Sequence, residues 1–174
     1  MKVKEEHEIR LIITDPTSVL SAGRNKKEYT LVDTYYLPEN GQRGWRLEER
    51  NLRLRKFGHG DAELILSLPE FKGIVKHGKK YFIASGTEQL LAEVLRNLGF
   101  MPCFKIERKQ GYFLDYQKWN IALEEIEGIG WTIDADVESE EDAWKLIEAL
   151  QGSVREVLKE PLPAYYCKTF NIDI

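Results

Sequence analysis

Several short segments of this chain carry charged residues at every second position, which places them on one face of a β-strand. They are Glu6, Glu8 and Arg10 in EEHEIRL, Arg53 and Arg55 in NLRLRKF, Glu124 in WNIALEE, and Asp134 and Asp136 in WTIDADVE. Paired carboxylates supply hard oxygen ligands for Mg²⁺ or Mn²⁺. Guanidinium groups supply forked donors that match phosphate oxygens. Together, these groups have the chemistry needed to hold a metal–polyphosphate complex.

Taken one strand at a time, each charged face could simply be solvated, as antiparallel sheets allow. Two features favour an enclosed position instead. The acidic and basic faces are largely segregated by strand, and the helical patterns in SGTEQLLAEVLRNLGF and SEEDAWKLIEALQG carry apolar stripes that must cover an apolar sheet face. If helices cover the apolar faces, the charged faces point inward. Because buried charges are costly unless they are paired or bound to ions, such an interior must hold water, metal and an anion.

The rest of the chain alternates between strand-like runs and a few helices. Strands are predicted over 5–14, 28–37, 51–55, 62–68, 80–84, 103–116, 119–128 and 130–138, with loops over 38–44 and 69–79. Helices are predicted within 14–27, over 85–100 with Ser85 as N-cap, over 139–152 with Ser139 as N-cap and Trp144 facing inward, and around 153–159. The predicted fold class is α+β, a closed antiparallel β-barrel (a tunnel of about eight strands) with helices packed outside.

Composition narrows the possible partners. The 174 residues are 43% hydrophobic and 31% charged, which predicts one globular domain over residues 1–174. A net charge of −4 gives no field that would attract nucleic acid, so no nucleic-acid partner is expected. No signal peptide and no apolar run of membrane-spanning length is present, so we expect a cytoplasmic protein, monomeric or homodimeric, without a membrane partner.

Six motifs follow one another in an informative order. They are EHEIR (6–10), DTYY (33–36), LRLR (52–55), LGF (98–100), ERKQGYF (107–113) and LEEIEGIGWTIDAD (123–136). This ordered set resembles the CYTH domains, also called triphosphate tunnel metalloenzymes, which include class IV adenylate cyclases, thiamine triphosphatases and inorganic triphosphatases. The LGF helix end and the EIEGIG turn look most like the class IV adenylate cyclase branch.

The resemblance implies a tunnel that binds a small-molecule triphosphate together with Mg²⁺ or Mn²⁺. Carried over by position, the metal ligands would be Glu6, Glu8, Glu124, Asp134 and Asp136, of which Glu6, Glu8 and Glu124 would also be catalytic. The phosphate-binding residues would be Arg10, Arg53 and Arg55, with Lys79 or Lys80 and Arg108 or Lys109. Strand parity decides which member of each pair faces inward, and the sequence leaves that parity open.

The chain departs from the family pattern at two positions. Ser67 stands near the place of a lysine, and an acid expected on the next strand is missing from the run Lys79 to Phe82. Losing a lumen cation should weaken phosphate binding, and Lys72 or Lys76 could reach in from the predicted loop.

The leading hypothesis is a metal-dependent enzyme that hydrolyses a nucleoside, thiamine or inorganic triphosphate. One alternative is a class IV adenylate cyclase that converts ATP to cyclic AMP and pyrophosphate. The other is a polyphosphate- or nucleotide-binding module that has lost catalysis.

Overall fold

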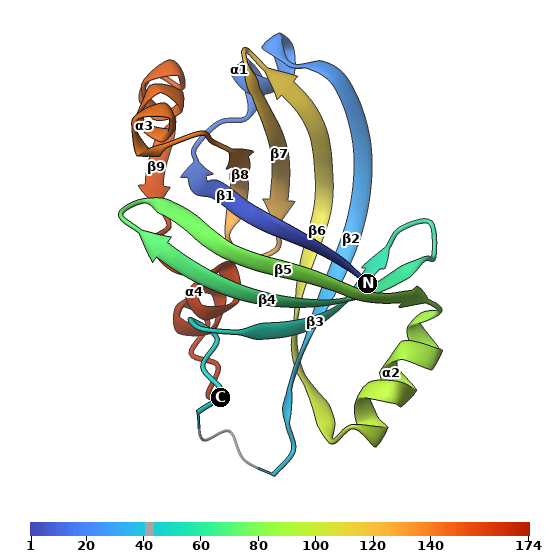
Figure 1. Ribbon diagram of the computed structural model, residues 1–174. Helices are drawn as coiled ribbons and strands as arrows, with labels where there is room; N and C mark the ends of the chain where they lie inside the picture. The colour runs from blue at the N-terminus through green and yellow to red at the C-terminus, as the bar shows by residue number, and fades with distance from the viewer. Residues whose placement is uncertain (41–43) are drawn as a thin grey trace.

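A single antiparallel sheet dominates the computed structural model, which describes residues 1–40 and 44–174 (Figure 1). Its strands are β1 (Lys2–Ile13), β2 (Arg24–Pro38), β3 (Asn51–Phe57), β4 (Ala62–Lys72), β5 (Val75–Gly86), β6 (Phe100–Tyr116), β7 (Trp119–Ile126), β8 (Gly130–Asp136) and β9 (Val154–Val157). The helices are α1 (Thr17–Ala22), α2 (Glu88–Asn97), α3 (Glu140–Ala149) and α4 (Leu162–Thr169). The strand order is β5-β4-β3-β2-β6-β7-β8-β1-β9, and β1 also pairs with β5. That extra pairing closes strands β1 to β8 into a barrel, which confirms the predicted fold class.

Strand β1 is the closing element because its two halves use different neighbours. Residues 2–8 pair with β5, from Phe82 back to Lys76, while residues 8–12 pair with β8, from Asp136 back to Thr132. In Figure 1 this strand crosses the front of the molecule beside β5. The acidic stretch near the start of the chain is therefore held between β5 and β8, the strands that carry Lys76, Lys80 and Asp134.

The loop predicted over 69–79 is wrong, because β4 and β5 form one long hairpin that turns only at Gly73 and Ile74. Pro69 and Gly78, which favoured a loop in the sequence, face each other as register partners in the sheet. Gly78 has φ +121°, and a Cβ there would lie 2.1 Å from the carbonyl oxygen of Leu68. Glycine allows this close backbone approach, so the hairpin continues through both residues. The predicted loop over 38–44 includes residues 41–43, which lie outside the described residues.

Residue alternation sorts the side chains between the two faces of the barrel. On β3, Leu52 and Leu54 pack in a cluster with Leu91 and Leu95 of α2. On β1, β7 and β8, a larger cluster joins Ile9, Leu11, Ile121, Leu123 and Ile133 to Ala143, Leu146 and Leu150 at α3. Burying one such leucine or isoleucine stabilises the fold by roughly 1.5–3 kcal/mol. The charged residues between these positions are thereby directed to the interior.

The helices themselves differ in part from the sequence prediction. Thr87, rather than Ser85, caps α2, because its hydroxyl accepts a hydrogen bond from the backbone N–H of Leu90. Ser139 caps α3 as predicted. Trp144, predicted to face inward, lies on the outer surface and is 52% exposed. The stripe on α2 is also narrower than predicted: Leu91 and Leu95 are buried, whereas Leu90, Val94 and Leu98 are exposed.

The C-terminal region also differs from the prediction. The segment predicted as a helix around 153–159 contains β9, which pairs with β1, and α4 begins only after Pro161. Proline fits the first turn of a helix, where its missing N–H costs nothing, so Pro161 and Pro163 stand at the start of α4. Within the described residues, no helix has the length and apolar character needed to cross a bilayer.

Candidate active site in the barrel interior

The interior of the barrel holds a cavity of about 340 Å³. Ten of the residues predicted from sequence line it: Glu6, Glu8, Arg10, Arg53, Arg55, Lys80, Arg108, Glu124, Asp134 and Asp136. The segment from Glu160 to Pro163, which leads into α4, lines the cavity as well. The charged strand faces therefore converge on one enclosed space, as predicted.

Three arginines meet at one buried carboxylate on β2. Asp33 is 0% exposed and accepts two hydrogen bonds from Arg55, with Nε 2.8 Å from Oδ1 and Nη2 2.9 Å from Oδ2. Arg108 Nη1 lies 3.0 Å from Asp33 Oδ2, and Arg53 Nε lies 3.4 Å from the same oxygen. Arg53 Nη1 also donates to Asn51 and to Ser67. Asp33 thus fixes the direction of all three guanidinium groups.

The two glutamates of β1 are held by lysines. Lys76 Nζ lies 3.0 Å from Glu6 Oε2 and 3.0 Å from Glu8 Oε2, so one ammonium group bridges both carboxylates. Lys80 Nζ lies 2.7 Å from Glu6 Oε1, and Lys4 Nζ lies 3.2 Å from Glu8 Oε1. Three ammonium groups therefore surround two buried carboxylates on the β1–β5 side of the cavity.

A third set of contacts centres on Arg10 and reaches the Asp33 cluster through Glu124 and Arg108. Arg10 Nη2 lies 2.6 Å from Asp134 Oδ2, and Arg10 Nη1 lies 3.5 Å from Glu124 Oε1. The other oxygen of Glu124 lies 3.1 Å from Arg108 Nε. Asp136, at the edge of the cavity, lies 3.6 Å from Lys4. Carboxylates and cations thus alternate around the lumen, so that each buried charge has a partner.

Burial and neighbouring charges oppose each other in setting the pKa values of the lumen acids. Burial would raise the pKa of Glu8, but the ammonium groups of Lys76, Lys80 and Lys4 outweigh it and lower that pKa below its ordinary range. For Asp33 and Glu124, the neighbouring arginines likewise overcome burial and lower the pKa. All three side chains are therefore ionised at neutral pH.

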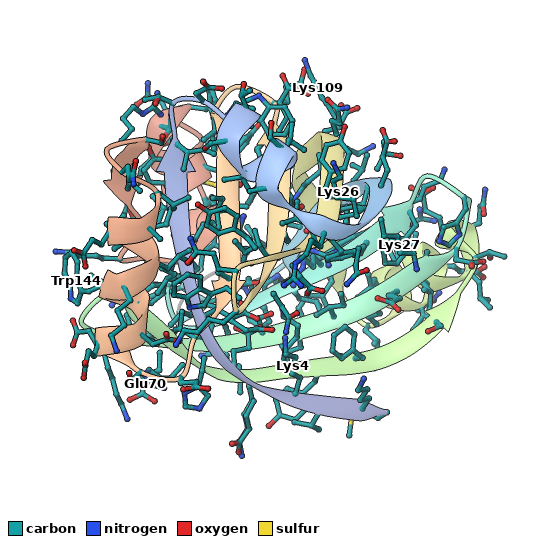
Figure 2. The ribbon with its side chains drawn as sticks, turned by 90° about the horizontal axis from the view of Figure 1, so that it is seen from above. Lys4, Lys26, Lys27, Glu70, Lys109 and Trp144 are labelled. Carbon is teal, nitrogen blue, oxygen red and sulfur yellow. The ribbon has the colours of Figure 1, made fainter. Side chains whose placement is uncertain are left out.

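Two of the predicted phosphate-binding residues point away from the cavity. Lys79 is exposed on the outer face of β5, and Lys109, which is 51% exposed, lies near Glu127 on the outer face of β6. Figure 2 shows Lys109 at the periphery of the molecule and Lys4 within the ring of strands. Alternation along each strand is the reason, because Lys80 and Arg108 take the inward positions next to them. The prediction for Lys79 and Lys109 is corrected accordingly.

Sequence reasoning missed several residues of the lumen and placed another loosely. Lys76, predicted to reach in from a loop, does so from within β5, whereas the other candidate, Lys72, is exposed. Asp33 was recognised only as part of the DTYY motif, and Lys4 and Tyr29 were not singled out. Counting alternate residues along the first strand could have found Lys4, which shares a face with Glu6.

The carboxylates meet one requirement of a divalent cation and not another. Their donors are hard oxygens, as Mg²⁺ and Mn²⁺ prefer. Glu6 Oε1 and Glu8 Oε2 are buried and make no hydrogen bond of good geometry among the described residues, although each lies within ion-pair distance of a lysine. Over residues 1–40 and 44–174, however, no three acidic, histidine or cysteine side chains converge on a single point. The oxygen donors are of the chemical type that such an ion prefers, but the Lys76 ammonium lies between the carboxylates of Glu6 and Glu8.

A less charged region of the same cavity lies further along β6. Tyr29 and Phe113 stack with ring centroids 4.3 Å apart, and Phe113 is 49% exposed. Asn25 donates to Asp115 at 2.8 Å, and Asn120 is the register partner of Asp115 on β7. This part of the cavity offers an aromatic surface with amide and carboxylate groups around it.

Comparison with known proteins finds solved structures that share this fold. No family model and no curated protein matches the sequence. Among solved structures, the PH1819 protein from Pyrococcus horikoshii OT3 has 18% identity and a TM-score of 0.72, with 95% of this chain and 99% of that chain covered. The putative adenylyl cyclase HpAC1 from Hippeastrum, described as having a dominant triphosphatase activity, has 14% identity, 98% coverage of both chains and a TM-score of 0.70.

A third structure, that of the inorganic triphosphatase NE1496, has 17% identity, covers 97% of this chain and 99% of that chain, and has a TM-score of 0.52. The chain shares the fold of these proteins. The tunnel architecture implied by the motifs is therefore confirmed. Because one fold can carry different functions, the activity must be argued from the lumen residues.

Proposed function

We propose that the tunnel binds the phosphate chain of a triphosphate and catalyses hydrolysis of its terminal phosphoanhydride bond. One observation carries the proposal: seven cationic side chains line a single enclosed cavity, namely Lys4, Arg10, Arg53, Arg55, Lys76, Lys80 and Arg108. Seven acidic side chains line the same cavity, so it carries no net positive charge; its guanidinium and ammonium groups nevertheless suit a compact polyanion, because phosphate oxygens accept charge-assisted hydrogen bonds from them. The shared fold with structures described as triphosphatases supports the same conclusion.

The lumen can supply the main requirements of phosphoryl transfer. In hydrolysis, a water oxygen bonds to the terminal phosphorus while the bond from phosphorus to the bridging oxygen breaks, and charge spreads over the equatorial oxygens. Fixed cations such as Arg53 and Lys80 would stabilise that charge without reorganising during the reaction. Glu124, ionised and held by Arg10 and Arg108, would accept a hydrogen bond from the attacking water. A divalent cation, when bound by the lumen carboxylates, would neutralise phosphate charge and lower the pKa of a bound water.

The aromatic region gives one reason to keep the cyclase alternative. The stacked pair Tyr29 and Phe113 could pack against a heteroaromatic ring, as an ATP substrate would require. Cyclase chemistry differs from hydrolysis in its nucleophile, because the ribose 3′-hydroxyl attacks the α-phosphorus and pyrophosphate leaves. Product identity therefore separates the two reactions.

The test is an incubation of the purified protein with tripolyphosphate, thiamine triphosphate or ATP, each with Mg²⁺ or Mn²⁺, followed by product identification. Release of inorganic phosphate supports hydrolysis, and cyclic AMP with pyrophosphate supports the cyclase. The variant Arg53→Met should lower either activity strongly. Lys56→Met, on the outer face of the same strand, should leave it unchanged.

Binding of a triphosphate without turnover would instead favour the alternative of a binding module. The pairing of Glu6, Glu124 and Asp134 with lumen cations is the feature that favours it. Absence of both binding and turnover for all three substrates would refute the proposed function.

A further inference from the structure

Within the lumen, the position of Lys76 gives the acid pair of β1 an unexpected partner. A divalent cation held by Glu6 and Glu8 would lie between their carboxylates. In this chain the Lys76 ammonium occupies that place, at 3.0 Å from an oxygen of each. The two glutamates are 2% and 5% exposed, so their charges are compensated inside the protein and not by solvent.

Two further lysines extend the same cluster. Lys80 lies four residues along β5 on the same face and contacts Glu6, and Lys4 contacts Glu8 from β1 itself. Because Lys4 also lies 3.6 Å from Asp136, three carboxylates balance the three ammonium groups, and Lys76 and Lys80 contact only Glu6 and Glu8 among them. Each ammonium has three N–H donors, and the glutamates use only part of this capacity. The remaining donors are available to an anion in the cavity.

A separate observation concerns Arg53. The Nε atom of Arg53 is buried and makes no hydrogen bond within the described part of the chain, although it lies 3.4 Å from Asp33. Ser67 stands where the family resemblance implies a lysine. Its hydroxyl is uncharged and accepts a hydrogen bond from Arg53 Nη1 at 2.9 Å. Lys80, the register partner of Ser67, provides a cation next to this position from the neighbouring strand.

We propose that Glu6 and Glu8 position Lys4, Lys76 and Lys80 as a built-in cation cluster that binds the phosphate chain in place of a divalent metal ion. This inference rests on the proposed function and deepens it, because it assigns metal-free phosphate binding to the site. Phosphate affinity then requires no metal, whereas a metal ion must displace Lys76 to reach the acid pair. Turnover can still depend on metal, so binding and catalysis have separate requirements.

The experiment measures tripolyphosphate affinity by titration calorimetry in EDTA for the wild type, Lys76→Met and Lys79→Met. Lys79→Met removes the same charge from the opposite face of β5 and is the matched control. The wild type should bind in EDTA. Lys76→Met should bind roughly 10- to 100-fold more weakly, the effect of losing a charge-assisted contact. Lys79→Met should change the affinity by less than about fivefold. If Lys76→Met does not fold, as judged by circular dichroism, Lys80→Met replaces it in the same comparison.

Mn²⁺ affinity without phosphate provides a second, independent readout. Lys76→Met removes the ammonium that bridges the two carboxylates and should bind Mn²⁺ at least about tenfold more tightly than the wild type, measured by electron paramagnetic resonance. Unchanged Mn²⁺ affinity would overturn the inference. Binding of tripolyphosphate only when Mg²⁺ or Mn²⁺ is added would overturn it too, while leaving the proposed function intact. Failure to bind under either condition would refute both.

Discussion

Replacing Asp33 by asparagine should destabilise the protein strongly while leaving its shape almost unchanged. The substitution keeps the side-chain volume and removes only the negative charge. Asp33 is fully buried and lies within 3.4 Å of nitrogen atoms of Arg53, Arg55 and Arg108. Breaking a buried ion pair by removing one partner costs about 3–5 kcal/mol, because the remaining charge is left without compensation. For a chain of this length, that corresponds to a fall in melting temperature of roughly 6–20 °C.

The assay is urea denaturation followed by circular dichroism, with Asp61→Asn as the control because its side chain is 85% exposed. The control should unfold at nearly the same urea concentration as the wild type. A midpoint for Asp33→Asn close to that of the wild type would refute the reasoning, because the three arginines would then not depend on this carboxylate.

A second prediction for Asp33→Asn concerns the increase in melting temperature caused by a bound ligand. Without Asp33, the three guanidinium groups have lost a competing anion, so tripolyphosphate should raise the melting temperature of Asp33→Asn by more than that of the wild type. Thermal unfolding with and without tripolyphosphate measures the difference. An equal or smaller increase in the variant would contradict this prediction.

Three more predictions follow from the described contacts. The pKa values of Glu8 and Asp33 are lowered below the ordinary 4.5 and 3.8. The stability that these carboxylates provide is therefore present above the ordinary values and is lost as the pH falls below them. Melting temperatures should be level near neutrality and drop below about pH 4. Gly78→Ala should cost at least about 1–3 kcal/mol in urea denaturation, because it forces a side chain into a φ of +121° against the carbonyl oxygen of Leu68; an unchanged midpoint would contradict the close approach. Phe113→Ala should weaken binding of ATP but not of tripolyphosphate in calorimetry if the aromatic region receives a base, and equal effects on both ligands would argue against that role.

Local alternation in the sequence was enough to predict the barrel and most of the charged residues that line it. Glu8 and Arg10 are separated by Ile9, and Arg53 and Arg55 by Leu54, so parity alone sorts them once the helices are known to lie outside. Ser139 and the helix it caps could be predicted because that signal is local as well.

The errors arose where a tertiary contact decides the outcome. The hairpin through Pro69 and Gly78 depends on a partner strand that composition cannot show. At Arg108, the register of the β6–β7 pairing shifts before Gln110, and such irregularities change which residues face inward along the strand. The role of Asp33 depends on arginines from β3 and β6, and only the closed sheet brings them to one carboxylate.

The most direct test of the central claim is a crystal structure of the protein with bound tripolyphosphate. The account predicts the phosphate chain inside the barrel, with its oxygens within hydrogen-bond distance of Arg53, Lys76 and Lys80. An anion bound only on the outer face, at Lys79 or Lys109, with an empty lumen, would contradict it.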